Sequence, residues 1–168
     1  WNSIIIMRLL LLFCFFIFSI HVFAQKSIDV LLSHYNTRSV PYISVQELRM
    51  APDKYVILDT RKREEFDVSH IPGAIWVGEK TRKNQLKSLI SDKNQPIMVY
   101  CSVGIRSEDF GEKMEKLGYT NVNNLYGSIF AWKDAGFPVI DSSGQETERV
   151  HIYGPHWGKY LETGTKVY

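Results

Sequence analysis

Short apolar runs alternate along this chain with segments whose apolar residues recur at helical spacing. The runs at 55–58, 75–77 and 97–100 have the length and the content of β-branched and aromatic residues that strands prefer, and 122–125 is predicted as a further strand. Runs that are apolar at successive positions are typical of strands covered on both faces, as in parallel sheets. The alternation of strands and helices therefore predicts an α/β fold, with a central, mostly parallel sheet and helices on both faces.

Helices are predicted between these strands. Ser44 and Glu47 have capping-box spacing and open the first of them. Apolar residues recur every three or four positions in 82–91 and again in 107–117, where Ser107 is the expected N-cap. Shorter elements are expected as an edge strand at 41–44, a helical turn at 64–66 and a short helix at 129–135.

The first 24 residues have the pattern of a secretory leader. Met7 and Arg8 begin it, an apolar run follows from 9 to 22, and a small-residue cleavage site ends at Ala24. Residues 1–6 are treated as an upstream extension. The alternative is an uncleaved membrane anchor, but the run is short for a spanning helix. We therefore expect an exported, periplasmic protein, associated with a membrane only if the leader is retained.

The predicted domain organisation follows from these patterns. Behind the leader (1–24) we expect a lead-in helix within 25–40 and one α/β domain over 41–140. Asp141 to Gly144 has the composition of a linker. The C-terminal extension, 141–168, is rich in aromatic residues and glycine and is expected to pack on the domain.

Charge and cysteine content narrow the possible functions. Removal of the leader removes Arg8 and no acidic residue, so the net charge falls from +2 to +1, which indicates no nucleic-acid partner. Cys14 leaves with the leader, and Cys101 is then the only thiol. An odd cysteine in an exported protein indicates a reactive group or an intermolecular bridge, whereas the alternative is a small buried apolar residue. Its position at the end of a strand favours reactivity.

Cys101 begins the loop that the chain is organised around. The loop joins the strand at 97–100 to the helix that follows, so backbone N–H groups can converge beside the thiol. Such donors stabilise a thiolate, and Arg106 can bind an oxyanion through two nitrogen atoms. We predict Cys101 as the nucleophile and the rest of the loop as the binding site: Ser102, Val103, Gly104, Ile105, Arg106 and Ser107.

Asp59 and Arg61 follow the strand at 55–58. If the strands are parallel, these residues share one rim of the sheet with Cys101. Arg61 can form a structural ion pair or line the site, and the sequence leaves both roles open. His70 is interpreted as a turn-stabilising residue rather than a general base. The histidines and the remaining cysteine lack ligand spacing, so no metal or other cofactor is expected.

Three blocks of sequence resemble the single-domain rhodanese (thiosulfate sulfurtransferase-like) family. They are residues 57–74, residues 100–107 and residues 125–138, and the resemblance extends over about 41–140. Ser69 and Ser128 depart from the family pattern, which often has glycine at both positions. Both side chains are small, so we expect them to change local turns rather than the chemistry.

This resemblance implies that Cys101 accepts a sulfane sulfur as a persulfide and passes it to a thiophilic acceptor. The implied partners are a small anionic donor such as thiosulfate and, as acceptor, cyanide or a thiol, which includes a thiol carried by a protein. The N–H groups from Ser102 to Arg106 would hold the sulfur, and Asp59 would brace the loop.

Two alternatives remain. Phosphatases of this fold have a loop one residue longer, C-x5-R, because phosphate needs a wider cradle. Here Arg106 is five positions after Cys101, which makes the loop C-x4-R and favours sulfur. The second alternative is a non-catalytic binding module, or a sensor of sulfur or redox state.

Overall fold

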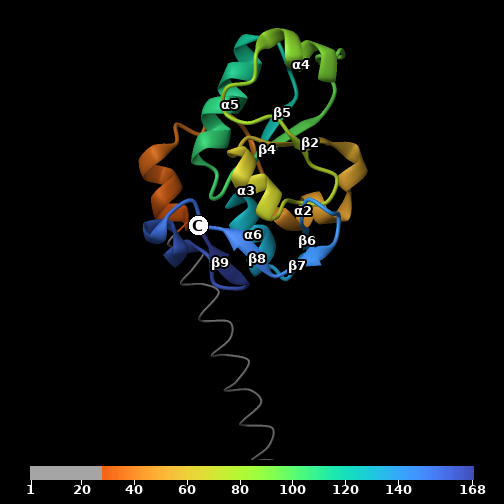
Figure 1. Cartoon of the computed structure of the whole chain (residues 1–168). Helices are drawn as coiled ribbons and strands as arrows, with labels where there is room; N and C mark the ends of the chain where they lie inside the picture. Colours follow the sequence, from red (N-terminus) through yellow and green to blue (C-terminus); the bar gives the residue numbers. More distant parts are fainter. Residues whose placement is uncertain (1–27) are drawn as a thin grey trace, which may run out of the picture.

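The computed structural model describes residues 28–168. A parallel five-stranded sheet lies at its centre, in the order β1-β5-β4-β2-β3 (Figure 1). Its strands are β1 (Tyr42–Ile43), β2 (Val56–Asp59), β3 (Ile75–Trp76), β4 (Ile97–Tyr100) and β5 (Val122–Leu125). The predicted α/β fold with a parallel sheet is confirmed. The predicted leader lies outside the described residues, and no helix within them has the length and apolar character needed to cross a bilayer.

Helices cover both faces of the sheet. One face carries helical residues 28–35, α2 (Val45–Met50) and α6 (Ser128–Asp134), and the other carries α4 (Lys83–Leu89) and α5 (Ile105–Lys116). The remaining helices are η1 (Pro52–Lys54), α3 (Arg63–Val68) and η2 (Pro155–Tyr160). We name the two apolar layers the α2/α6 core and the α4/α5 core.

Strand β4 contributes to both cores, which explains its continuous apolar run. Met98 and Tyr100 belong to the α2/α6 core, whereas Ile97 and Val99 belong to the α4/α5 core. All four are fully buried. Side chains of successive strand residues point to opposite faces, so every position of a central strand must be apolar.

The carboxyl ends of β2 and β4 lie together. Asp59, the last residue of β2, is in register with Tyr100, the last residue of β4. Cys101 follows Tyr100 directly, so Asp59 and Cys101 share one rim of the sheet. This arrangement is the one expected for parallel neighbouring strands.

One predicted boundary is wrong. The N-cap of α5 is Gly104, with a φ angle of 115°, and not Ser107 as predicted, so the helix begins at Ile105. The left-handed region that includes this angle is accessible to glycine and costly for other residues. Ser107 consequently lies inside the first turn of α5, where its side chain is fully buried.

The C-terminal extension forms two small sheets. Strand β6 (Val139–Ile140) pairs with β7 (Glu146–Thr147), and β8 (Arg149–His151) pairs with β9 (Thr165–Val167). Residues 141–144, predicted as a linker, form the turn of the β6–β7 hairpin. Val150, Ile152 and Leu161 are buried in the α2/α6 core, so the extension is part of the packed structure.

Polar contacts also attach the extension to α6. Lys133 is 6% exposed, and its Nζ lies 2.7 Å from Oε1 of Glu148. The carboxylate of Asp134 accepts hydrogen bonds from the backbone N–H groups of Glu162 and Thr163, at 2.9 and 2.8 Å. These contacts connect the extension with α6, the helix that lies within the third sequence block, 125–138.

Candidate active site

Cys101 lies where β4 ends and the loop to α5 begins. Its side chain is 1% exposed, and Sγ accepts a hydrogen bond from the backbone N–H of Gly104 at 3.2 Å. The left-handed conformation of Gly104 directs this N–H back toward the sulfur. The loop therefore supplies a donor where negative charge would develop on the sulfur.

The hydroxyl of Ser107 lies between Cys101 and Asn124. Its Oγ is 2.7 Å from Oδ1 of Asn124 and 3.6 Å from Sγ of Cys101. The Asn124 amide nitrogen donates to the carbonyl of Gly104 at 2.9 Å, which fixes the orientation of the amide. A hydroxyl carries one proton, so Ser107 can donate either to Asn124 or to the sulfur. The N-cap predicted from sequence is instead a donor next to the thiol.

The surroundings of Cys101 favour the thiolate. Burial raises the pKa of the Cys101 thiol, but the positive charge of Arg106 and hydrogen bonds from Ser107 and Gly104 outweigh burial, so that the pKa is lowered overall. The sulfur is therefore ionised at a lower pH than an ordinary cysteine, and a thiolate is the nucleophilic form.

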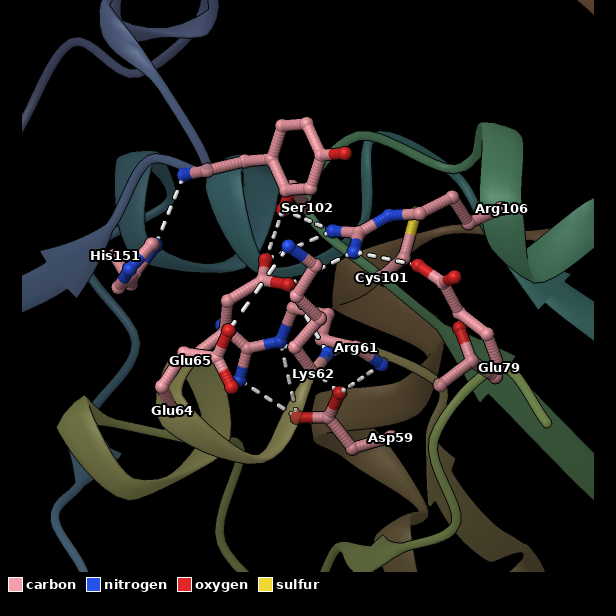
Figure 2. Close-up of polar contacts among 12 residues, drawn as sticks. Asp59, Arg61, Lys62, Glu64, Glu65, Glu79, Cys101, Ser102, Arg106 and His151 are labelled. Carbon is pink, nitrogen blue, oxygen red and sulfur yellow. Dashed lines mark hydrogen bonds and ion pairs between the residues drawn. The ribbon is translucent and has the colours of Figure 1, made fainter. Parts of the chain in front are cut away.

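Arg106 is held inside the protein by acidic side chains (Figure 2). Its Nη1 and Nη2 donate to the two carboxylate oxygens of Glu65 at 2.8 Å each, and Nη1 also donates to Glu79 at 3.0 Å. Nη2 contacts Ser102 Oγ at 2.9 Å. Burial raises the pKa of Glu65, but Arg106 outweighs this effect and holds the pKa below its usual value. The predicted two-nitrogen grip of Arg106 is thus used on Glu65, and it braces the loop against α3.

Helix α6 supports the loop from the other side. The backbone N–H groups of Ile129 and Phe130 donate to the carbonyls of Cys101 and Ser102, at 3.3 and 3.2 Å. Ser128 accepts the N–H of Cys101 at 3.1 Å, and its φ angle is 51°. This left-handed conformation explains why glycine suits the position. The serine of this chain adds a hydrogen bond to the backbone of Cys101.

Glu108 anchors a polar cluster behind the loop. Its Oε2 accepts hydrogen bonds from Asn36 at 3.0 Å and from Tyr42 at 2.9 Å. Asn36 also donates to the carbonyl of Gly104 at 2.9 Å. The segment before the sheet is therefore connected to the loop through a carboxylate that is 2% exposed.

Asp59 and Arg61 form a buried ion pair. Both side chains are fully buried, and Nη2 of Arg61 lies 2.6 Å from Oδ2 of Asp59 and donates to the carbonyl of Ser69 at 2.7 Å. The guanidinium carbon is 5.6 Å from the ring centroid of Tyr100. Of the two roles left open for Arg61, the geometry fits the structural ion pair.

His70 packs in a turn, away from the thiol. Its ring stacks on Phe66 with centroids 3.8 Å apart, and its backbone forms a bridge with Ile140. Ser69 is fully buried, and its Oγ has no hydrogen-bond partner within residues 28–168. Over the same residues, no group of three or more His, Cys, Asp or Glu side chains converges on a point where a metal ion could bind.

A small cavity of about 150 Å³ opens above the sulfur. The loop and the C-terminal extension line it together, through Cys101, Ser102, Val103, Ile105, Arg106, Tyr153 and Trp157. A larger hollow of about 640 Å³ runs along the edge strand β3, but Cys101 is not among its lining residues. Of these two hollows, the smaller one is lined by Cys101.

Several site residues were not assigned a role from sequence. Glu65 lies in the first of the three sequence blocks, 57–74, and 41 positions before Arg106. An acidic residue in a predicted helical turn is a candidate partner for a loop arginine that must be buried. Tyr153 and Trp157 are 52 and 56 positions after Cys101 in the chain. Their aromatic character predicts packing, but only the folded extension brings them to the cavity.

A family model described as "Rhodanese-like domain" matches residues 44–135. The match covers more than half of the chain, so the chain belongs to the family of rhodanese-like domains.

Among curated relatives, the thiosulfate sulfurtransferase PspE of Escherichia coli (strain K12) is 32% identical over 83 residues, which are 49% of this chain and 76% of PspE. The thiosulfate sulfurtransferase GlpE of Coxiella burnetii (strain RSA 331 / Henzerling II) is 29% identical over 106 residues, covering 63% of this chain and 95% of GlpE. The crystal structure of a thiosulfate sulfurtransferase from Pseudomonas aeruginosa matches with a TM-score of 0.59 and 23% identity, over 73% of this chain and 23% of that one. At this identity the structural match shows a shared fold.

An Arg106→Ala substitution is expected to raise the pKa of the Cys101 thiol, because the nearest positive charge is lost. It also leaves the fully buried Glu65 without its main partner, which typically costs about 3–5 kcal/mol of folding stability. The pH profile of thiol alkylation measures the first effect, and urea unfolding measures the second.

Arg106→Lys is the matched control, because lysine keeps the charge but cannot donate to both oxygens of Glu65 in the same fork. We expect its alkylation midpoint to lie closer to that of the wild type, with reduced stability. An alkylation midpoint that is identical in wild type and Arg106→Ala would contradict the role of Arg106 in thiolate stabilisation.

Proposed function

We propose that this protein is a sulfurtransferase that moves a sulfane sulfur from a donor such as thiosulfate to a thiophilic acceptor. The observation that carries the proposal is the lowered pKa of Cys101 in a C-x4-R loop. Gly104 N–H and the Ser107 hydroxyl contact its sulfur, and the positive charge of Arg106 favours the thiolate. The family membership and the thiosulfate sulfurtransferases among the relatives support it.

In the first step, the Cys101 thiolate attacks the outer sulfur of thiosulfate. A new S–S bond forms, the S–S bond of the donor breaks, and its electron pair leaves with sulfite. The product on the enzyme is an anionic persulfide, which carries the same charge as the original thiolate. Gly104 N–H and Ser107 are positioned to stabilise negative charge on the Cys101 side of this group.

In the second step, an acceptor attacks the outer sulfur of the persulfide. With cyanide the products are thiocyanate and the Cys101 thiolate, and with a thiolate they are a persulfide of the acceptor and the same Cys101 thiolate. No net oxidant or reductant is needed. A single cysteine is sufficient for this cycle, since the acceptor releases the sulfur without a resolving thiol.

We infer further that the protein acts outside the cytoplasm, in the periplasm. Its donors are small sulfur-containing anions, and its acceptors are cyanide or thiols, including a thiol on a protein. The leader pattern at 7–24 supports the location. Fractionation of cells that produce the full chain, followed by N-terminal sequencing, tests the location and the cleavage near Ala24.

Intact-protein mass spectrometry after incubation with thiosulfate tests the proposed function. We expect the mass to increase by one sulfur atom and to return to its starting value when cyanide is added. A chain that gains no sulfur, or a Cys101→Ser variant that gains it equally, would refute the proposal. Hydrolysis of an aryl phosphate, assayed in parallel, distinguishes the phosphatase alternative.

A further inference from the structure

The cavity above Cys101 is walled in part by residues outside the family match. That match ends at residue 135, whereas Tyr153 and Trp157 belong to the extension. Val103 and Ile105 of the loop line the same cavity. Apart from Arg106 and the ionisable thiol of Cys101, no charged side chain of the described residues lines the cavity. Most of its wall is therefore apolar or aromatic.

Tyr153 is held in an unusual conformation beside Arg106. Its φ angle is 64°, a left-handed value that is costly for a residue with a large side chain. Its N–H donates to Nδ1 of His151 at 3.0 Å, and the N–H of Gly154 donates to the carbonyl of the buried Ile152 at 2.7 Å. These contacts fix the backbone that carries the ring.

The two aromatic rings and the guanidinium form one wall. The guanidinium carbon of Arg106 is 4.7 Å from the ring centroid of Tyr153. The rings of Tyr153 and Trp157 meet edge to face, with centroids 6.5 Å apart. Trp157 also packs against the α2/α6 core, so its position is fixed from behind. The wall offers π surfaces to a ligand that enters above the sulfur.

Fixed charges around the cavity do not favour a dianion. Arg106 is paired with Glu65 and Glu79. Lys62 lies 5.1 Å from the centroid of the Tyr153 ring, and it is paired with Glu64 at 3.9 Å. Together these two basic and three acidic groups carry one net negative charge. A second negative charge on a ligand therefore gains no attraction here, and repulsion from the acids works against it.

We propose that Tyr153 and Trp157 form an aromatic subsite that selects compact organic thiosulfonates, R–SO₂–S⁻ with an apolar R group, over inorganic thiosulfate. The proposal rests on the proposed sulfurtransferase function. Thiosulfonates are monoanions, and their apolar body matches the aromatic wall. The cavity of about 150 Å³ is smaller than the roughly 300–1,000 Å³ of pockets for drug-sized ligands, so R is no larger than a single ring.

Sulfur transfer from a thiosulfonate to Cys101 accounts for every bond, electron pair and charge. The Cys101 thiolate attacks the terminal sulfur, an S–S bond forms to Cys101, and the bond between that sulfur and the sulfonyl group breaks. The electron pair leaves with the sulfinate R–SO₂⁻. One negative charge is on the donor before the step and one on the sulfinate after it, while the charge on Cys101 is conserved in the persulfide.

The test compares three donors with cyanide as the acceptor: thiosulfate, methanethiosulfonate and benzenethiosulfonate. Each kcat/KM is divided by the rate of the uncatalysed reaction of the same donor, which removes differences in leaving groups. We expect benzenethiosulfonate to be the best substrate, followed by methanethiosulfonate and then thiosulfate. In Tyr153→Ala and Trp157→Leu, the preference for the phenyl over the methyl compound should fall about three- to tenfold.

Tyr168→Ala is the control, because Tyr168 is a 79% exposed tyrosine of the same extension. Its donor preferences should equal those of the wild type. Tyr153 is 46% exposed, so its substitution leaves the packed core intact. Equal corrected kcat/KM values for the phenyl and methyl compounds, or a preference unchanged in both variants, would overturn the aromatic subsite. If none of the three donors leaves sulfur on Cys101, the sulfurtransferase function itself is refuted.

Discussion

Replacement of Cys101 by serine is expected to abolish sulfur transfer, with a loss of turnover on the order of 10⁴-fold or more. A serine hydroxyl is not ionised near neutral pH, and it cannot carry sulfur as a persulfide. The donors near Sγ, which are the N–H of Gly104 and the hydroxyl of Ser107, would then have no thiolate to stabilise. Thiocyanate formation from thiosulfate and cyanide measures the loss.

The Cys101→Ser variant should keep its fold, because the side chain remains small and the N–H of Gly104 still has an oxygen to donate to. Circular dichroism and urea unfolding verify this point. Ser102→Ala, in the same loop, is the matched control, since Ser102 contacts Arg106 and Glu65 but not the sulfur. If Cys101→Ser turned over the donor as fast as Ser102→Ala, or faster, the nucleophilic role of Cys101 would be contradicted.

An Asp59→Ala substitution is expected to destabilise the protein by about 3–5 kcal/mol, the typical cost of leaving a buried charge without its partner. Arg61 is fully buried, and besides Asp59 its guanidinium donates to the carbonyl of Ser69 alone among the described residues. Its Nη1 already lacks a hydrogen-bond partner within residues 28–168. Since domains are typically stable by about 5–15 kcal/mol, such a loss is large. Urea unfolding measures it.

The double variant Asp59→Leu/Arg61→Met separates a structural ion pair from a catalytic one. Apolar residues of similar volume commonly replace buried ion pairs at little cost, so stability should be restored relative to Asp59→Ala. Sulfur loading of Cys101 should persist as well, because neither residue lines the cavity above the sulfur. A stable double variant that no longer loads sulfur would contradict the structural assignment and place Asp59 or Arg61 in the mechanism.

The sheet could be predicted from the sequence because its central strands are buried on both faces. Ile97, Met98, Val99 and Tyr100 must all be apolar, and such a run is easily recognised. The predicted N-cap of α5, Ser107, lies three residues after the observed one, Gly104. Ser107 has the chemistry of an N-cap, but Gly104 reaches a left-handed conformation that a sequence pattern does not report.

The site was predictable where its residues are close in sequence and less so where they are distant. The loop from Cys101 to Ser107 is contiguous, and its spacing indicates anion and thiolate chemistry. The partner of Arg106 could not be read from the loop, and the arginine was expected to face the substrate. Glu65 and Glu79 come from other segments, and they occupy the guanidinium instead. Long-range packing decides such pairings.

The attachment of both flanking segments has a consequence for truncated chains. A fragment cut to the family match, 44–135, would lose Asn36, which holds Glu108 behind the loop that begins at Cys101. It would also lose Val150 and Ile152 from the α2/α6 core and uncover apolar side chains. The homologous range thus marks what this chain shares with its relatives, whereas we expect the unit that folds on its own to include the flanking segments. Chimeras that exchange only the shared range would carry the loop without its supports.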